Sequence, residues 1–151
     1  MEQEARRQLA EFAARYTPDI EEQIHAAHAI MSSMLPGALE IVYDNYNALV
    51  IGFGASDRMA DFVFSIAAYP RYLTLFFAHG VDLENTKGLL QGEGSMVRSI
   101  RLNSPEQLHD PDIQELMTAA LERATPIDAS KPNRLIIKSV SAKQRPRRPK
   151  G

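Results

Sequence analysis

The sequence predicts one α+β domain, in which an antiparallel sheet of five to six strands packs against N-terminal helices and one C-terminal amphipathic helix. Three observations lead to this fold class. Apolar residues recur every three or four positions near both ends of the chain, a period of two replaces this spacing between residues 39 and 102, and tight turns separate the segments there. The length of 151 residues fits a single domain, and a hydrophobic content of 44% is sufficient for a core.

Two helices are expected before the sheet. The second runs from Pro18 to Met34, because Thr17 is a good N-cap, Pro18 suits the first helical position, and Pro36-Gly37 ends the pattern. The first helix is indicated by the spacing of its apolar residues, which are Ala5, Leu9, Phe12, Ala13 and Tyr16.

Short segments with a period of two predict the strands. Leu39, Ile41 and Tyr43 alternate with the acidic residues Glu40 and Asp44, and the turn-forming residues 44–47 then return the chain as a hairpin. Because short strands joined by tight turns pair with their neighbours in the chain, we expect antiparallel pairing. A short helix is expected over residues 82–90. The expected strands are 39–43, 48–54, 62–68, 72–78 and 96–102.

Two helix starts follow the fifth strand. Ser104-Pro105-Glu106-Gln107 resembles a capping box, and Asp110-Pro111-Asp112 opens the helix with the clearest amphipathic pattern in the chain. Residues 135–140 then form a sixth strand or pack as an arm. We divide the chain into one α+β domain over residues 1–130, an arm or edge strand over 131–142, and a basic tail over 143–151 that is disordered when unbound.

The chain contains no cysteine, which excludes disulfides, thiolate catalysis and cysteine metal sites. No apolar run approaches the roughly 18 residues that a membrane-spanning helix needs. The acidic N-terminus, Met1-Glu2-Gln3-Glu4, differs from a secretory signal. We therefore expect a cytoplasmic protein without membrane association.

Several pieces of the sequence resemble the YdhG-like family, whose function is unknown. They are a helix that ends in Leu35-Pro36, the segment Tyr69-Pro70-Arg71-Tyr72 with its following strand, and Leu89-Leu90-Gln91-Gly92-x-Gly94 leading to Val97-Arg98. The resemblance covers residues 31–124. It implies an α+β fold with an antiparallel sheet packed on helices. Some relatives are labelled as iron chaperones by analogy with frataxin-like proteins, so the resemblance also implies iron or other metal handling as an alternative function.

Motifs of catalysis are missing from the sequence. It has no nucleophile elbow, no phosphate loop and no dinucleotide-binding fingerprint. We therefore do not expect an enzyme. The first functional hypothesis is a non-catalytic binding module for a small anionic ligand or a protein partner, and sheet-edge pairing offers a route to a homodimer.

The fifth strand and the tyrosines suggest where an anionic ligand would bind. Arg98 shares a strand face with Ile100 and Leu102, and a guanidinium among apolar side chains requires an anion or a carbonyl as its partner. The alternative is that Arg98 pairs with Glu93 or with a backbone carbonyl. The remaining candidate ligand-binding residues are Tyr43, Tyr69 and Tyr72, which combine apolar area with a polar tip, and the amides of Gly92 and Gly94.

A metal site is the second hypothesis. Glu21, His25 and His28 fall on one side of the second helix at about 100° per residue. A carboxylate and two imidazoles could hold Fe(II) or Zn(II) together with ligands from elsewhere. The alternative is an ordinary solvated helix flank, and no other cofactor is expected.

The formal net charge of −2 conceals a division along the chain. Residues 131–151 carry eight of the 17 basic residues and none of the 19 acidic ones, so this segment has a charge of +8 and residues 1–130 a charge of −10. The cations of the tail are Lys143, Arg145, Arg147, Arg148 and Lys150. The tail can contact phosphates, so weak nucleic-acid contact through the tail is the third hypothesis. The tail contains no aromatic residue to stack bases, so a sequence-specific or single-strand role is not expected. The alternatives are that it docks on its own acidic body or on a second subunit, or that it only promotes solubility.

Overall fold

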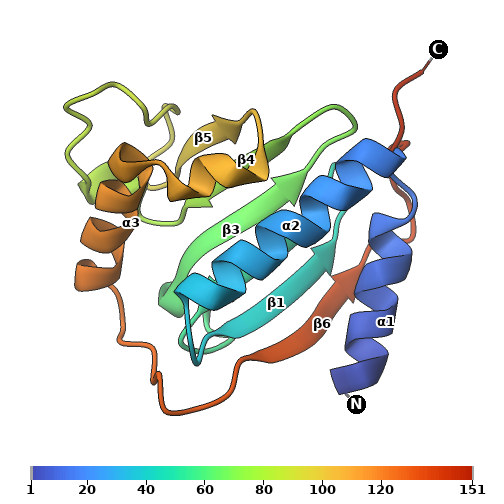
Figure 1. Ribbon diagram of the computed structural model, residues 1–151, viewed down its shortest axis with the longest axis horizontal. Helices are drawn as coiled ribbons and strands as arrows, with labels where there is room; N and C mark the ends of the chain where they lie inside the picture. The colour runs from blue at the N-terminus through green and yellow to red at the C-terminus, as the bar shows by residue number, and fades with distance from the viewer. Residues whose placement is uncertain (1, 151) are drawn as a thin grey trace.

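A computed structural model that describes residues 2–150 contains both expected N-terminal helices (Figure 1). They are α1 (Glu2–Ala13) and α2 (Pro18–Met34). The hydroxyl of Thr17 accepts a hydrogen bond from the amide of Ile20, and Pro18 occupies the first turn, where an amide has no helical partner. The boundaries predicted for the second helix are therefore confirmed.

Six strands form one sheet in the order β5-β4-β3-β2-β1-β6. The strands are β1 (Leu39–Asp44), β2 (Leu49–Gly54), β3 (Phe62–Ala68), β4 (Leu73–Phe77), β5 (Arg98–Leu102) and β6 (Arg134–Val140). All neighbours are antiparallel except β1 and β6, which are parallel, so the prediction of a wholly antiparallel sheet is wrong for this pair. The reason is that no tight turn joins β1 to β6. Residues 45–133 lie between these two strands, so a hairpin does not set the direction of β6.

The segment after β4 contains a loop where the sequence predicted a helix over residues 82–90. A 3-10 turn (Gly80–Asp82) is followed by irregular backbone. The side-chain amide of Asn85 donates to the carbonyl of Leu90 and its oxygen accepts from the amide of Leu90, at 2.8 and 2.9 Å. These bonds give the backbone an alternative to helical pairing, which explains the difference.

The region after β5 forms a short 3-10 helix (Pro105–His109) and then α3 (Pro111–Arg123). Asp110 caps α3 as predicted, because its carboxylate accepts from the amide of Asp112. The predicted capping box does not form. Ser104 makes no side-chain cap, and the oxygen of Gln107 accepts from the amide of Asn103 instead.

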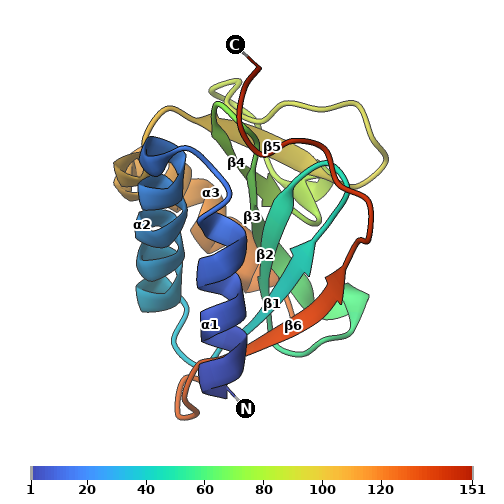
Figure 2. The ribbon, with the colours of Figure 1, turned by 90° about the vertical axis from the view of Figure 1, so that its right-hand side faces the viewer.

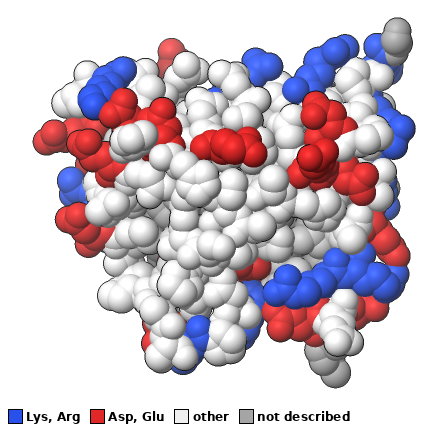
Figure 3. Space-filling view, viewed as in Figure 1, with Lys and Arg blue, Asp and Glu red and all other residues white. Residues whose placement is uncertain are grey.

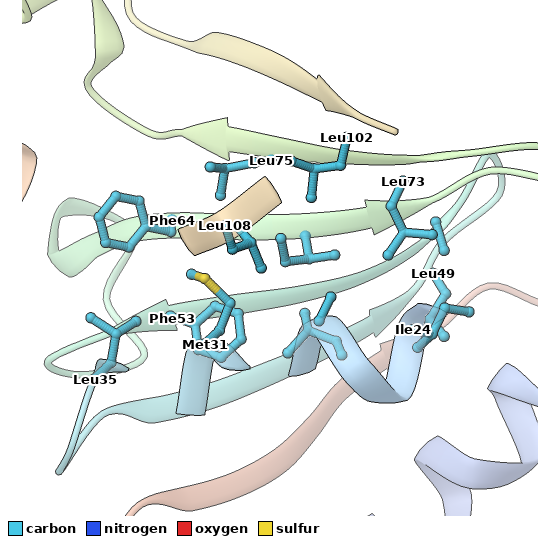
Figure 4. Close-up of a cluster of buried hydrophobic side chains, with 14 of the residues drawn as sticks. Ile24, Met31, Leu35, Leu49, Phe53, Phe64, Leu73, Leu75, Leu102 and Leu108 are labelled. Carbon is cyan, nitrogen blue, oxygen red and sulfur yellow. The ribbon is translucent and has the colours of Figure 1, made fainter. Parts of the chain in front are cut away.

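All three α-helices lie on one face of the sheet, as Figure 2 shows. The strand register aligns a row of buried aliphatic side chains across this face, from Val42 on β1 through Ile51 and Ile66 to Leu75 on β4. Met31 of α2 packs over this surface (Figure 4). Burial of each such side chain stabilises the folded state by about 1.5–3 kcal/mol. The main hydrophobic core therefore lies between this face and the helices.

The free edge of β6 is partly occupied by α1, which packs beside it. The amide of Leu135 donates to the carboxylate of Glu2 at 3.1 Å. A side chain bound to an edge amide removes one position at which another strand could pair. The homodimer expected from edge pairing stays a prediction.

Within residues 2–150, no helix combines the length and the apolar character that crossing a membrane requires.

Tyr16 joins the connection between α1 and α2 to the sheet. Its side chain is fully buried. Its hydroxyl donates to the carbonyl of Ala68 at 2.7 Å and accepts from the amide of Leu49 at 3.1 Å. One phenol therefore satisfies backbone groups on β2 and β3, which fixes the position of the helices on the sheet.

We predict that Tyr16→Phe lowers the free energy of unfolding by about 1–3 kcal/mol, because two buried backbone groups lose a hydrogen-bond partner. Urea unfolding followed by circular dichroism measures this change. The matched control is Tyr46→Phe, whose side chain is 44% exposed and which should change stability by less than about 0.5 kcal/mol. Equal effects of the two substitutions would contradict the role assigned to Tyr16.

Candidate functional site

Two carboxylates of β1 lie on the face of the sheet that the helices cover. Glu40 and Asp44 flank Val42 in the strand, and each is 1% exposed. Removing a carboxylate from water costs several kcal/mol unless hydrogen bonds and opposite charge compensate for it. The partners of these two acids therefore show which distant segments the fold must bring to β1.

Asp44 is compensated mainly by the C-terminal tail. One oxygen accepts from Arg147 at 2.9 Å, and the other accepts from the side-chain amide of Gln144 at 2.8 Å. Arg15 lies 3.4 Å from the same carboxylate. The side chain of Arg147 is only 4% exposed and also donates to the carbonyl of Asn45 at 2.5 Å. The guanidinium of Arg147 is thus a buried anchor.

Backbone contacts hold the rest of the tail against the body. The amide of Ser141 donates to the carbonyl of Asp44, and the amide of Arg145 donates to the carbonyl of Tyr46, both at 2.9 Å. The guanidinium of Arg148 donates to the carbonyl of Arg15 at 3.1 Å. The sequence predicted a disordered tail over residues 143–151. This prediction was for the unbound tail, and docking on the acidic body was among the alternatives. In the structure, residues 144–148 contact their own domain, and Gly151 lies outside the described residues.

The docked tail forms one wall of an open groove with a volume of about 640 Å³. The turn between β3 and β4 forms the opposite wall. We call this feature the tyrosine–arginine groove, and its lining residues are Asn47, Tyr69, Pro70, Arg71, Tyr72, Arg145, Pro146, Arg148, Pro149 and Lys150.

Stacked aromatic rings form part of this groove. The ring centroids of Tyr69 and Tyr72 are 5.1 Å apart, with planes inclined by 28°. The guanidinium of Arg101 on β5 lies over the Tyr72 ring, 3.8 Å from its centroid. Burial and then the neighbouring Tyr72 raise the pKa of Tyr69 above its ordinary value. Its protonated hydroxyl can donate a hydrogen bond.

The groove has a strongly positive lining. We define the groove cations as its four basic residues, Arg71, Arg145, Arg148 and Lys150. None of the described lining residues is acidic, and within residues 2–150 no ion pair neutralises a groove cation. Figure 3 shows basic side chains gathered near the C-terminal end of the chain. The groove is therefore suited to an anion.

The structure separates Arg98 from the tyrosine pair. Arg98 pairs in register with Phe77, at the opposite end of β4 from the turn that carries Tyr69. Its guanidinium donates to the carbonyls of Gly94 at 2.6 Å and Val97 at 2.8 Å. A backbone carbonyl as the partner of Arg98 was the alternative that the sequence left open, and this is the arrangement observed.

The glycines near Arg98 serve close packing of the chain. A Cβ atom at Gly80 would lie 2.5 Å from Cβ of Arg98, so only glycine allows this approach. Gly92 has a φ of 127°, which L side chains rarely adopt. Gly92 and Gly94 are exposed in the loop that Arg98 closes, and they lie apart from the tyrosine–arginine groove.

Tyr43 lies on the sheet face away from the helices. Its ring centroid is 6.3 Å from that of Phe62, and it pairs in register with Val50. It does not line the groove. Of the three tyrosines expected at the ligand site, the structure therefore brings Tyr69 and Tyr72 together and leaves Tyr43 elsewhere.

The residues of the expected metal site do not form a cluster. Nε2 of His28 lies 2.8 Å from the carboxylate of Glu40, whereas His25 is exposed. Among residues 2–150, no three His, Cys, Asp or Glu side chains, including Glu21, come close enough to hold a metal ion. The reason is that His28 turns from the helix flank toward a buried carboxylate.

Glu40 is the centre of a buried polar cluster. Besides His28, it accepts from the hydroxyl of Ser32 and from the side-chain amide of Asn133, the latter at 3.2 Å. Burial raises the pKa of Glu40, but the bonds from His28, Ser32 and Asn133 outweigh this effect and hold its pKa below the usual value. The cluster ties α2 to β1 and to the segment before β6.

Sequence reasoning missed Asn47 and Arg71, which line the groove, and Arg101, which lies over the Tyr72 ring. Asn47 and Arg71 were interpreted only as parts of turns, and Arg101 as one residue of a strand. Their only shared signal is that each lies in or beside a turn at one end of the sheet. Chain order gives no indication that the tail joins them.

Comparison with known proteins adds no relative: no family model, curated protein or solved structure matches this chain. The resemblance to the YdhG-like family stays a prediction.

We predict that Glu40 stabilises the fold in a pH-dependent manner. Because its pKa is lower in the folded chain, its contribution is complete above the usual pKa of 4.5 and is lost as the pH falls through the folded value. Urea unfolding between about pH 5 and pH 3 should show a shallower loss of stability for Glu40→Gln than for the unaltered protein. The other carboxylates contribute to the pH dependence of both proteins. If the stabilities of both proteins fall in parallel with pH, Glu40 does not contribute in this way.

We predict that Arg147→Met lowers the free energy of unfolding by about 3 kcal/mol, because it leaves the buried carboxylate of Asp44 without its main compensating charge. Adding Asp44→Asn should recover part of the loss. The matched control is Lys143→Met, which removes an exposed tail cation and should have an effect below about 0.5 kcal/mol in the same urea titration. An equally small effect at Arg147 would rule out the anchor.

Proposed function

We propose that this protein is a non-catalytic binding module that holds a small anionic ligand in the tyrosine–arginine groove. The observation that carries the proposal is the set of four groove cations, which face no acid within the groove and form no ion pair within residues 2–150. Uncompensated cations in a concave site attract anions and bind them through charge-assisted hydrogen bonds.

The size of the groove supports a small-molecule ligand. Ligand sites usually have volumes of about 300–1,000 Å³. The groove volume of about 640 Å³ falls within this range. Its lining comes from three segments that are distant in the chain, which is typical of a site that depends on the folded state.

The chemistry of the lining supports binding rather than catalysis. General acid–base catalysis most often uses an imidazole or a carboxylate, and none of the described lining residues carries either group. The described residues of the groove supply arginines, a lysine, tyrosines, an asparagine and prolines instead. These groups can recognise and orient an anion.

We predict that the protein binds tripolyphosphate and that Arg145→Ala combined with Arg148→Ala weakens this binding at least tenfold, because two charge-assisted contacts are lost. Isothermal titration calorimetry at about 50 mM and about 200 mM salt measures affinity and its salt dependence. Affinity should fall as the salt concentration rises.

Two control variants locate the site. Lys143→Ala removes an exposed tail cation that does not line the groove, and it should leave the affinity within about twofold. Arg98→Ala removes the β5 arginine that pairs with the far end of β4, and it should also leave the affinity within about twofold. If Arg98→Ala weakens binding and the double variant does not, the ligand binds at the fifth strand, and the groove is not the site.

A further inference from the structure

The tyrosine–arginine groove combines apolar walls with its cations. The apolar part of the lining consists of Tyr69, Pro70, Tyr72, Pro146 and Pro149. A bare inorganic anion would meet the cations but would leave these surfaces in contact with water. A ligand that carries a flat apolar group beside its negative charge would cover both kinds of surface.

The tyrosine pair is held in a fixed arrangement before any ligand arrives. Tyr69 stacks on Tyr72, and Arg101 lies 3.8 Å over the second ring. Both tyrosines are half-buried and line the groove. Rings that are already positioned lose little conformational freedom on binding, which favours stacking of a planar heterocycle.

Three of the groove cations, Arg145, Arg148 and Lys150, are held beside the tyrosine pair by the docked tail. Arg147 anchors the chain between Arg145 and Arg148, and prolines at positions 146 and 149 restrict the backbone. Guanidinium groups match the oxygens of a phosphate through paired hydrogen bonds. Asn47, also in the lining, offers an amide that can both donate to and accept from the edge of a base.

We propose that the ligand of the groove is a nucleoside phosphate, whose base stacks on the tyrosine pair and whose phosphate binds the groove cations. This inference rests on the proposed function and names the ligand class of the same site. The tail itself lacks an aromatic residue, which argued from the sequence against base stacking. The fold supplies the aromatic rings from the turn between β3 and β4.

The test compares ligands that differ only in the base. In calorimetric titrations, AMP should bind about tenfold more tightly than ribose 5-phosphate, which has the same phosphate without the base. Tyr69→Leu should remove most of this difference. Tyr43→Leu, which changes a tyrosine outside the groove, should preserve it.

A further titration distinguishes the two sources of this chemistry. If an octamer of thymidylate binds about a hundredfold more tightly than TMP, the nucleotide belongs to a single-stranded nucleic acid. Similar affinities for the two would identify a free nucleotide. Either result supports the nucleoside-phosphate ligand.

Equal affinities for AMP and ribose 5-phosphate would overturn this inference. The proposed function would then stand as long as tripolyphosphate still binds and the Arg145 and Arg148 substitutions still weaken it. Absence of binding by tripolyphosphate, AMP and ribose 5-phosphate would overturn both proposals. Circular dichroism of each variant separates a loss of binding from a loss of folding.

Discussion

The fold depends on the burial of a negative charge at the end of β1. Asp44 is 1% exposed, and it lies on the face of the sheet that the helices cover. A carboxylate in that position destabilises the folded state unless a cation and further hydrogen-bond donors reach it. Arg147 and Gln144 satisfy this requirement from more than ninety residues further along the chain. The hairpin that contains Asp44 is therefore stable only when the C-terminal segment docks on it.

This requirement explains the course of the last part of the chain. After α3, the backbone crosses to the far side of β1 and enters the sheet as its parallel neighbour, which brings residues 141–150 to the end of β1 where Asp44 lies (Figure 1). Glu40, at the other end of the same strand, receives Asn133 just before β6 begins. Glu40 and Asp44 of β1 thus bind the segments that precede and follow β6. These contacts hold β6 in register with β1 from both ends.

The parts of the fold that the sequence predicted are those set by local chemistry. The cap at Thr17 and the proline beside it define the start of α2, and alternation with tight turns defines the hairpins. Interactions over long separations were not predictable in this way. Nothing in the tail distinguishes Arg147 from Arg145 or Arg148 until the structure shows which one reaches a buried carboxylate. At the candidate site, Tyr69 and Tyr72 could be selected from composition. The arginines near them are not Arg98 but Arg71 of the turn, Arg101 of β5, and Arg145 and Arg148 of the tail.

The arginines of the C-terminal tail therefore have two different roles. Arg147 is buried and its charge is matched by Asp44, so it contributes to the stability of the fold and leaves no net charge for a ligand. Arg145 and Arg148 flank it in the sequence, remain exposed, and have no acid opposite them in the groove. Since their position is set by the buried anchor, the groove exists only while the tail is docked. A ligand that bridges the tail and the turn at Tyr69 would bind the docked state alone, and its binding energy would add to the stability of the contact between Asp44 and Arg147.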